Sequence, residues 1–190
     1  MESVGLFFGS FNPIHNGHLA IARYLLDKGY CQKVWFVVSP QNPWKADRTL
    51  LDEEKRLEIV KASIEQESGM EVCNIEFNMP RPSYTYQTLQ VLAQKFPKQK
   101  FILIMGGDNL PCFHLWKNYK EIQANYPILV YPRPNIDVEG VNMYNIKMIE
   151  APLSMISSTE IRKKIQAGDD ISDLVSMHAL SLILSYYQTL

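Results

Sequence analysis

The stretch FGSFNPIHNGH, residues 8–18, places two histidines directly after a strongly apolar run. His15 and His18 are three residues apart, so both imidazoles can point the same way if a helix begins near them. Two ring N–H donors at a helix start, where the helix dipole favours negative charge, suit a phosphate group. Gly17 would leave room between the rings for that phosphate to approach.

Two small residues precede the histidines, because the apolar run ends in Gly9 and Ser10. They keep side chains small where the backbone would pass close to a ligand. A solvated turn is the alternative for the whole stretch. A zinc site is weaker, because HxxH lacks the HExxH spacing and no acidic ligand is adjacent, so we predict no metal bound by the protein itself.

A second stretch, ISSTEIRKKI, occupies residues 156–165. Ser157 and Glu160 have the capping-box spacing, in which a hydroxyl is followed three residues later by a carboxylate. Gly168 suits the position just past the end of that helix. On its own, this pattern also describes an ordinary capped helix at the surface.

Six apolar, β-branched or aromatic runs predict strands, with segments of helical character between most of them. The runs are SVGLFFG, KVWFVVS, MEVCNIEF, KFILIMGG, PILVYP and NIKMIEA. This alternation is typical of an α/β fold: a Rossmann-like parallel sheet with helices on both faces and a small helical C-terminal part. We expect helices over about Asn16–Lys28, from near Asp52, and over about Thr85–Lys95.

The last forty residues predict two helices, one from SSTE to Gly168 and one over about Asp173–Tyr187. We therefore expect a single domain, 1–190. Residues 1–150 would form an α/β nucleotide-binding core, and residues 151–190 would form the helical part that carries ISSTEIR.

Bulk composition excludes several classes of protein. The formal net charge is −1, which gives no general attraction for nucleic acid or an anionic membrane. No apolar stretch reaches the roughly 20 residues that cross a bilayer, and the first residues lack the pattern of a signal peptide. Three widely spaced cysteines, Cys31, Cys73 and Cys112, fit buried thiols of a cytoplasmic protein. The sequence does not report the oligomeric state, so a homo-oligomer stays open.

The two motifs together carry a family resemblance. GSFNPIHNGH resembles the (T/H)xGH signature of the nucleotidyltransferase superfamily, and ISSTEIRKKI resembles its second phosphate signature, ISSTxIR. With RPSYTYQTL, GGDNLPCFHLW and YPRPN between them, the chain is similar over essentially its whole length to the bacterial nicotinate-nucleotide adenylyltransferases. It departs from them at Asn12, where many members carry Asp, and at Ser176 and His178, where a proline often follows the valine.

The resemblance implies adenylyl transfer from ATP to nicotinate mononucleotide, giving deamido-NAD and pyrophosphate, a step of NAD biosynthesis. The phosphate of the mononucleotide would attack the α-phosphorus in line. Phosphate is already a competent nucleophile at neutral pH, so positioning and charge stabilisation would supply the catalysis. Mg²⁺ is expected to arrive with ATP, held mostly by phosphate and water.

The resemblance also implies roles for residues. His15 and His18 would hold the α- and β-phosphates, and Arg162 the β- and γ-phosphates. Gly106 and Asp108 would bind the ribose hydroxyls, although Asp108 could instead cap the next helix. The implied ATP-binding set is Gly9, Ser10, Phe11, His15, His18, Gly106, Asp108, Ile156, Ser157, Ser158, Thr159 and Arg162, of which His15, His18 and Arg162 would be catalytic.

For the second substrate, Trp116 offers a flat face on which a pyridinium ring could stack, or it belongs to the core. Tyr84 and Thr85, just before a helix, would meet the group on that ring. Backbone N–H groups at a helix start favour the nicotinate anion over the neutral amide. Lys45 and Arg133 are candidates for the mononucleotide phosphate, or are solvated loop cations.

Rival functions remain. A sister adenylyltransferase would use nicotinamide mononucleotide or phosphopantetheine, and pantetheine has no ring for Trp116 to stack on. A non-catalytic nucleotide-binding module is disfavoured by intact His15, His18 and Arg162. A nucleic-acid-binding protein is disfavoured by the balanced charge and by the lack of interleaved basic and aromatic residues.

Overall fold

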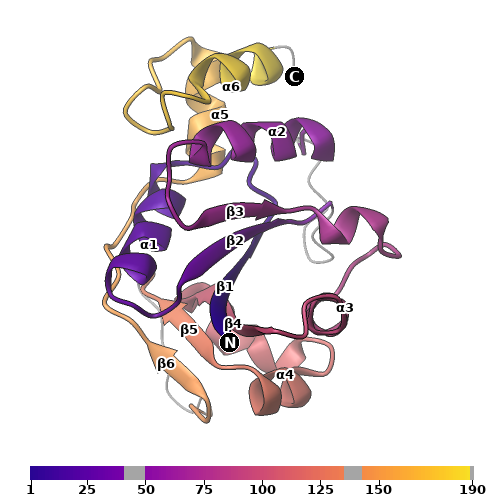
Figure 1. Cartoon of the computed structure of the whole chain (residues 1–190). Helices are drawn as coiled ribbons and strands as arrows, with labels where there is room; N and C mark the ends of the chain where they lie inside the picture. Colours follow the sequence, from indigo (N-terminus) through magenta and orange to yellow (C-terminus); the bar gives the residue numbers. More distant parts are fainter. Residues whose placement is uncertain (41–49, 135–142, 189–190) are drawn as a thin grey trace.

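A computed structural model describes residues 1–40, 50–134 and 143–188. Within these residues, six parallel strands form one sheet in the order β3-β2-β1-β4-β5-β6 (Figure 1). Each overlaps a predicted apolar run and extends at most one residue beyond it, so the predicted α/β fold with a parallel sheet is confirmed. The strands are β1 (Glu2–Gly9), β2 (Lys33–Val38), β3 (Met70–Cys73), β4 (Gln99–Gly106), β5 (Ile128–Tyr131) and β6 (Ile146–Met148).

Helices cover both faces of the sheet. Helices α1, α2, α5 and α6 contribute to one buried cluster with one face, and α3, α4 and the 3-10 segment η2 contribute to a second cluster with the other face. Figure 1 shows α5 and α6 (orange to yellow) stacked beyond α2. The bounds are α1 (Asn16–Asp27), α2 (Glu53–Ile64), η1 (Ile75–Asn78), α3 (Thr85–Lys95), η2 (Gly107–Leu115), α4 (Tyr119–Asn125), α5 (Ser158–Ala167) and α6 (Leu180–Tyr187).

The central strands β1 and β4 are apolar from their third residue on, because both of their faces are buried there. In β1, Val4 and Leu6 pack in the cluster with α3, and Phe7 packs in the cluster with α1. In β4, Leu103 and Ile104 divide between the two clusters in the same way. Alternate side chains of these strands therefore point to opposite faces of the sheet. The hydropathy of the sequence does not show this alternation, because the residues on both faces are apolar.

The order of the strands creates a place for a ligand. The chain moves outward from β1 to β2 and β3 and then returns to place β4 on the other side of β1. In open parallel sheets, connections on either side of such a switch point leave in opposite directions, and the crevice that binds ligands lies beyond the carboxyl ends of the strands, here β1 and β4. The predicted histidines follow β1, and Asp108 follows β4.

One predicted strand is shorter than expected. The run MEVCNIEF forms a strand only to Cys73, and Ile75–Asn78 form the 3-10 turn η1. Glu76 in this turn is 2% exposed and accepts hydrogen bonds from the hydroxyls of Ser83 and Thr88. The strand therefore ends at Cys73, and the turn that follows brings the Glu76 carboxylate to its two donors.

The last helix also begins later than predicted, at Leu180 and not at Asp173. The carbonyls of Asp173 and Leu174 accept hydrogen bonds from the side chain and backbone N–H of Asn16, at 2.9 and 2.8 Å. Because these two carbonyls accept hydrogen bonds from α1, they do not accept the N–H groups of a following helical turn. Residues 172–179 form turns instead.

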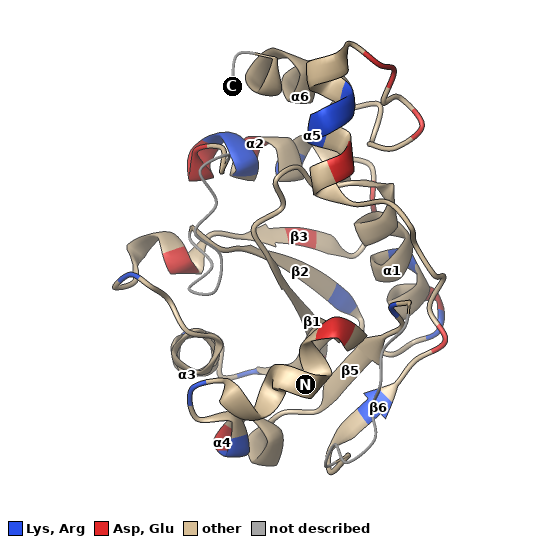
Figure 2. Ribbon diagram, turned by 180° about the vertical axis from the view of Figure 1, so that it is seen from behind, with Lys and Arg blue, Asp and Glu red and all other residues tan. Residues whose placement is uncertain are grey.

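Charged residues of both signs are spread over the helices (Figure 2), and α2 and α5 each carry basic and acidic positions. Among the described residues, no helix has the length and apolar character needed to span a bilayer. Of the cysteines, Cys31 is buried as expected, but Cys112 is exposed.

Candidate active site at the carboxyl edge of the sheet

The loop between β1 and α1 is tightly folded. Phe11 adopts a positive φ of 46°, and the peptide bond between Asn12 and Pro13 is cis. The Phe11 ring is buried over Gly9, where an added Cβ would lie 2.9 Å from the ring. Gly9 is therefore small because of Phe11, which is a different reason from the predicted approach of a ligand.

His15 and His18 lie together at the start of α1. Their ring centroids are 3.7 Å apart, and the His15 backbone N–H donates to His18 Nδ1 at 3.3 Å. A neutral His18 must therefore carry its proton on Nε2, which leaves that N–H as its donor. Among the described residues, the buried Nδ1 of His15 has no hydrogen-bond partner.

Both histidines are held in the neutral form. Burial, with a smaller contribution from the Arg133 charge, lowers the pKa of His15 to about 3. For His18, burial among Phe7, Phe11 and His15 is the largest cause of a pKa well below 6.5, followed by the charges of His15 and Arg133. A bound anion would offset this loss of hydration.

Gly17 has a neighbour that the sequence did not reveal. A Cβ at Gly17 would lie 2.2 Å from Ser154 Oγ and 3.0 Å from His15 Nδ1. Ser154 therefore occupies the room that we expected a phosphate to use beside Gly17. It places the segment before α5 directly against the histidines.

The second motif packs on the first. Ser157 caps α5 by accepting the Glu160 N–H at 3.1 Å, and Gly168 ends it with a φ of 77°, both as predicted. Ser158 Oγ donates to the Pro13 carbonyl at 2.9 Å. Arg162 Nη1 donates to the Asn12 carbonyl at 2.7 Å. The two ends of the chain thereby build one side of the crevice.

The other residues of this motif line the same junction. Thr159 is exposed, and its hydroxyl lies 3.5 Å from Arg162 Nη2. Ile156 is partly buried against the core cluster of α1, and its N–H donates to Ser154 Oγ at 3.3 Å. Ser10 is partly buried at the end of β1.

Beyond β4, Asp108 folds back over Gly106. A Cβ at Gly106 would lie 2.3 Å from Asp108 Oδ1 and 3.0 Å from the Tyr131 ring, so only glycine fits there. Arg133, just after β5, lies 3.7 Å from Asp108 Oδ1 and 5.2 Å from the centre of the Tyr131 ring. Its charge also lowers the pKa of both histidines, so Arg133 lies near Asp108 and near the histidine pair.

Three of the residues predicted for the second substrate, Tyr84, Thr85 and Trp116, lie on the opposite face of the sheet. Tyr84 and Thr85 lie at the start of α3 and are partly buried. Trp116 is also partly buried and meets Phe113 edge to face, at 5.5 Å between ring centres. Lys117, next to Trp116, lies 4.5 Å from the centre of the Tyr84 ring. These candidates therefore form one group, whereas Lys45 lies outside the described residues.

Sequence reasoning missed Arg56, which is fully buried in α2. Its guanidinium donates to four backbone carbonyls that follow β1 and β2 or precede α2, namely those of Ser10, Ser39, Pro40 and Leu51. Burial lowers the pKa of this arginine from its ordinary value. The available signal was its place beside Leu57, on the apolar side of a helix whose other charges are exposed.

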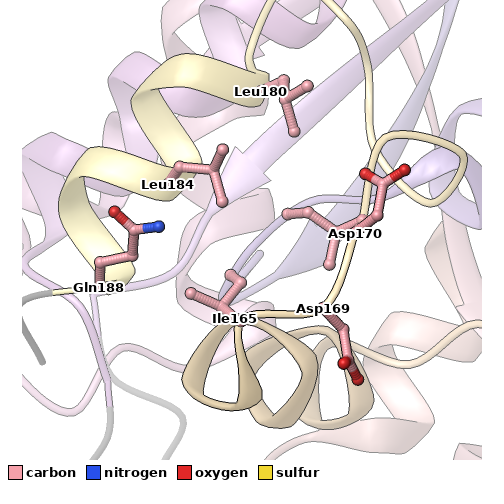
Figure 3. A pocket seen from close by; sticks show the side chains of 8 residues that line it. Ile165, Asp169, Asp170, Leu180, Leu184 and Gln188 are labelled. Carbon is pink, nitrogen blue, oxygen red and sulfur yellow. The ribbon is translucent and has the colours of Figure 1, made fainter.

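A separate hollow of about 250 Å³ lies between α5 and α6. Ile165, Leu180 and Leu184 line it, with Asp169 and Asp170 at the turn after α5 (Figure 3). Its lining contains none of the predicted site residues, so it is distinct from the crevice.

Comparisons with known proteins agree with this geometry. The cytidylyltransferase-like family model matches residues 6–164. A probable nicotinate-nucleotide adenylyltransferase of Cytophaga hutchinsonii is 43% identical over 187 residues, covering 97% of each chain. One of Flavobacterium psychrophilum is 46% identical over 175 residues, covering 90% of this chain and 91% of its own.

Solved structures share the fold. Nicotinic acid mononucleotide adenylyltransferase of Plasmodium falciparum complexed with NaAD has a TM-score of 0.80 and 19% identity, covering 98% of this chain and 96% of its own. The same enzyme complexed with APC has a TM-score of 0.78 and 18% identity, with the same coverage.

Proposed function

Because this chain belongs to the cytidylyltransferase-like family and, within it, to the nicotinate-nucleotide adenylyltransferases, we propose that its paired histidines and Arg162 transfer the adenylyl group of ATP to nicotinate mononucleotide. The products are deamido-NAD and pyrophosphate. The observation that carries these roles is the packing of ISSTEIR on the histidine loop, through Ser158 to Pro13 and Arg162 to Asn12.

His18 and His15 hold the α- and β-phosphates. Neutral His18 donates its Nε2 proton, since Nδ1 already accepts the His15 N–H. The attacking phosphate needs no general base, so the histidines act by stabilising the charge that builds on the α-phosphoryl group. Their aromatic surroundings exclude water and strengthen that interaction.

Arg162 and the start of α5 hold the leaving pyrophosphate. The guanidinium contacts Asn12 through Nη1, which fixes its plane, and lies one turn from the N–H groups of the helix start. Ser157, Ser158 and Thr159 add hydroxyl and backbone donors. We propose that ATP arrives as its Mg²⁺ complex, with the ion held mainly by phosphate and water. Asp108, beyond β4, receives the ribose hydroxyls.

Nicotinate mononucleotide binds from the face that α3 covers. Its ring stacks on Trp116, and its carboxylate meets the N–H groups at the start of α3, near Tyr84 and Thr85. Arg133 meets a phosphate between the two groups of residues, beside Asp108. Lys45 keeps its predicted role at the mononucleotide phosphate.

We also propose that residues 151–190 belong to the same domain as the α/β core. Their contacts with the β1–α1 loop run through Ser158, Arg162 and Leu174. A separate domain would not supply hydrogen bonds to the interior of the site.

The test is pyrophosphate release from ATP and Mg²⁺ with the purified protein. Nicotinate mononucleotide, nicotinamide mononucleotide and phosphopantetheine are compared at equal concentration. Release with the nicotinate compound should be at least about tenfold faster than with the amide, a gap of about 1.4 kcal/mol. His18→Ala is the inactive control, with kcat lowered at least about 100-fold in a folded protein.

Each other outcome has a definite meaning. Faster release with the amide or with phosphopantetheine would assign this protein to a sister reaction. Release with none of the three would leave a nucleotide-binding module. A folded His18→Ala enzyme with ordinary turnover would remove the histidine from the mechanism.

A further inference from the structure

Glu76 is a buried carboxylate to which the proposed reaction gives no role. It lies in η1, just after β3, and is 2% exposed. Its Oε2 accepts the Ser83 hydroxyl and its Oε1 accepts the Thr88 hydroxyl, each at 2.8 Å. Ser83 and Thr88 are themselves buried.

The two hydroxyls lie on either side of the residues predicted to recognise the pyridine ring. Ser83 directly precedes Tyr84, and Thr88 is in the first turn of α3. The Thr88 N–H also donates to the Tyr84 carbonyl, at 3.1 Å. One carboxylate thus holds both sides of the start of α3, where Tyr84 makes no capping hydrogen bond with its own side chain.

Burying a carboxylate at this position has a large free-energy cost if the side chain serves only to pack. Removing it from water costs several kcal/mol that two hydroxyl donors offset only in part. An apolar residue at the same point would pack with Ile75, a neighbour of the core cluster, without that cost. The carboxylate instead fixes the orientation of the start of α3, because two hydrogen bonds set both the position and the rotation of this segment.

We propose that Glu76 is a positioning residue for the mononucleotide: it holds the first N–H groups of α3, and with them Tyr84 and Thr85, in the geometry that receives the ring carboxylate of nicotinate. This proposal rests on the proposed function. A displacement of about 1 Å at a binding group can cost about 100-fold in rate, so two anchors on one segment are significant.

The effect should be confined to one substrate. The contacts that support the histidine loop are those of Arg162 with Asn12 and of Ser158 with Pro13. They lie on the α1 and α5 side of the sheet and involve no residue near Glu76. The start of α3 instead contacts Lys117, beside Trp116. Loosening Glu76 therefore disturbs the ring subsite and leaves the triphosphate subsite in place.

The experiment measures KM for each substrate, kcat and the acid-to-amide ratio of kcat/KM in the full chain. The variants are Glu76→Gln, whose amide cannot accept a hydroxyl on its nitrogen, and Ser83→Ala, which removes one donor. Thr88→Ser keeps the hydroxyl and serves as the conservative rescue. Glu71→Gln, an exposed carboxylate on β3 that pairs with Lys33, is the matched control.

We expect Glu76→Gln and Ser83→Ala to raise KM for nicotinate mononucleotide about tenfold, which is about 1.4 kcal/mol, with KM for ATP changed less than twofold. The preference for acid over amide should fall with it. Thr88→Ser and Glu71→Gln should retain both constants.

Equal changes in KM for both substrates, or no change in KM for the mononucleotide, would overturn the positioning role. If Glu76→Gln does not fold, Ser83→Ala decides, since it removes only one of the two hydrogen bonds. A wild-type enzyme that releases no pyrophosphate with nicotinate mononucleotide would instead overturn the proposed function and this inference with it.

Discussion

His15 and His18 are neutral groups in a site proposed to bind a highly charged ligand. Burial lowers the pKa of each, and the Arg133 charge lowers it further. Neutral rings lose less hydration free energy than charged ones when the site is empty, and they still offer an N–H to a phosphate. The consequence is a dependence of stability on pH.

Stability should fall on the acid side of pH 6.5. The unfolded chain binds a proton at each histidine below about pH 6.5, whereas folded His15 does so only near pH 3. The unfolded state therefore binds more protons in this window, and each histidine costs about 1.4 kcal/mol per pH unit. Urea unfolding of His15→Gln between pH 7.5 and 5 should show a shallower loss than the wild type. Exposed His178→Gln is the control, and an unchanged slope in His15→Gln would contradict the expectation.

Trp116 provides a second test on a single residue. It is partly buried and packs edge to face on Phe113, which leaves ring surface for a ligand. Trp116→Ala should raise KM for the mononucleotide by about 2- to 30-fold, the equivalent of about 0.5 to 2 kcal/mol, with ATP affinity unchanged. Leu115→Ala, at an exposed neighbour, should change neither constant. A loss of cooperative unfolding in Trp116→Ala, with KM unaltered, would place this tryptophan in the core only.

The elements that build the crevice are joined by side chains that reach backbone carbonyls. Arg56 of α2 ties together the segments that follow β1 and β2. Arg162 of α5 does the same for the loop before α1. A loop at the end of a strand has few partners of its own, so these guanidinium groups supply what regular secondary structure does not.

Removing the Arg56 guanidinium should destabilise the fold strongly. Arg56→Met leaves four carbonyls without this donor, two of them buried and two partly buried, so we expect the free energy of unfolding to fall by at least about 3 kcal/mol. Arg56→Lys keeps the charge and part of the bonding and should lose less. Urea midpoints measure both, and Lys61→Met, at an exposed position of the same helix, should stay within about 0.5 kcal/mol. Equal loss in the Lys and Met variants would contradict the carbonyl contacts.

Elements were easier to predict than these contacts. The bounds of α3 could be predicted from the residues around it, PSYT before it and Pro97 beyond it. The start of α5 could be predicted from the spacing between Ser157 and Glu160. The start of α6 was wrong because carbonyls at residues 173 and 174 bond to Asn16, a partner 157 residues away for the first of them. Local patterns carry no information about such long-range hydrogen bonds. The contacts of Arg56 with the carbonyls of Ser10 and Ser39, 46 and 17 residues away, were missed for the same reason.

In the whole molecule, two helical layers meet the crevice from opposite faces of one sheet. The layer with α1, α2, α5 and α6 carries the histidines and Arg162, and the layer with α3 and α4 carries the ring subsite. The sheet lies between the two groups of residues. The sheet itself therefore fixes the relative positions of the two proposed subsites.

Helix α6 supports the histidine loop from a distance. Tyr187 Oη donates to the buried Asn12 Oδ1 at 2.6 Å, and Asn12 Oδ1 also accepts the Leu51 N–H. Tyr187→Phe should lower the free energy of unfolding by about 1 kcal/mol. Tyr186→Phe is the matched control, because its hydroxyl bonds to Glu58 at an exposed place and should cost less than about 0.5 kcal/mol. Thermal or urea unfolding of the pair gives the comparison, and equal losses would argue against a role for the buried bond.

This contact also sets an order of events during synthesis. Tyr187 is translated 175 residues after Asn12. At about 5 to 20 residues per second, roughly 9 to 35 s pass between the synthesis of Asn12 and that of its partner Tyr187. A nascent chain can complete its central strands before then, but the support of the loop at Asn12 is complete only once the final helical turn has emerged and docked.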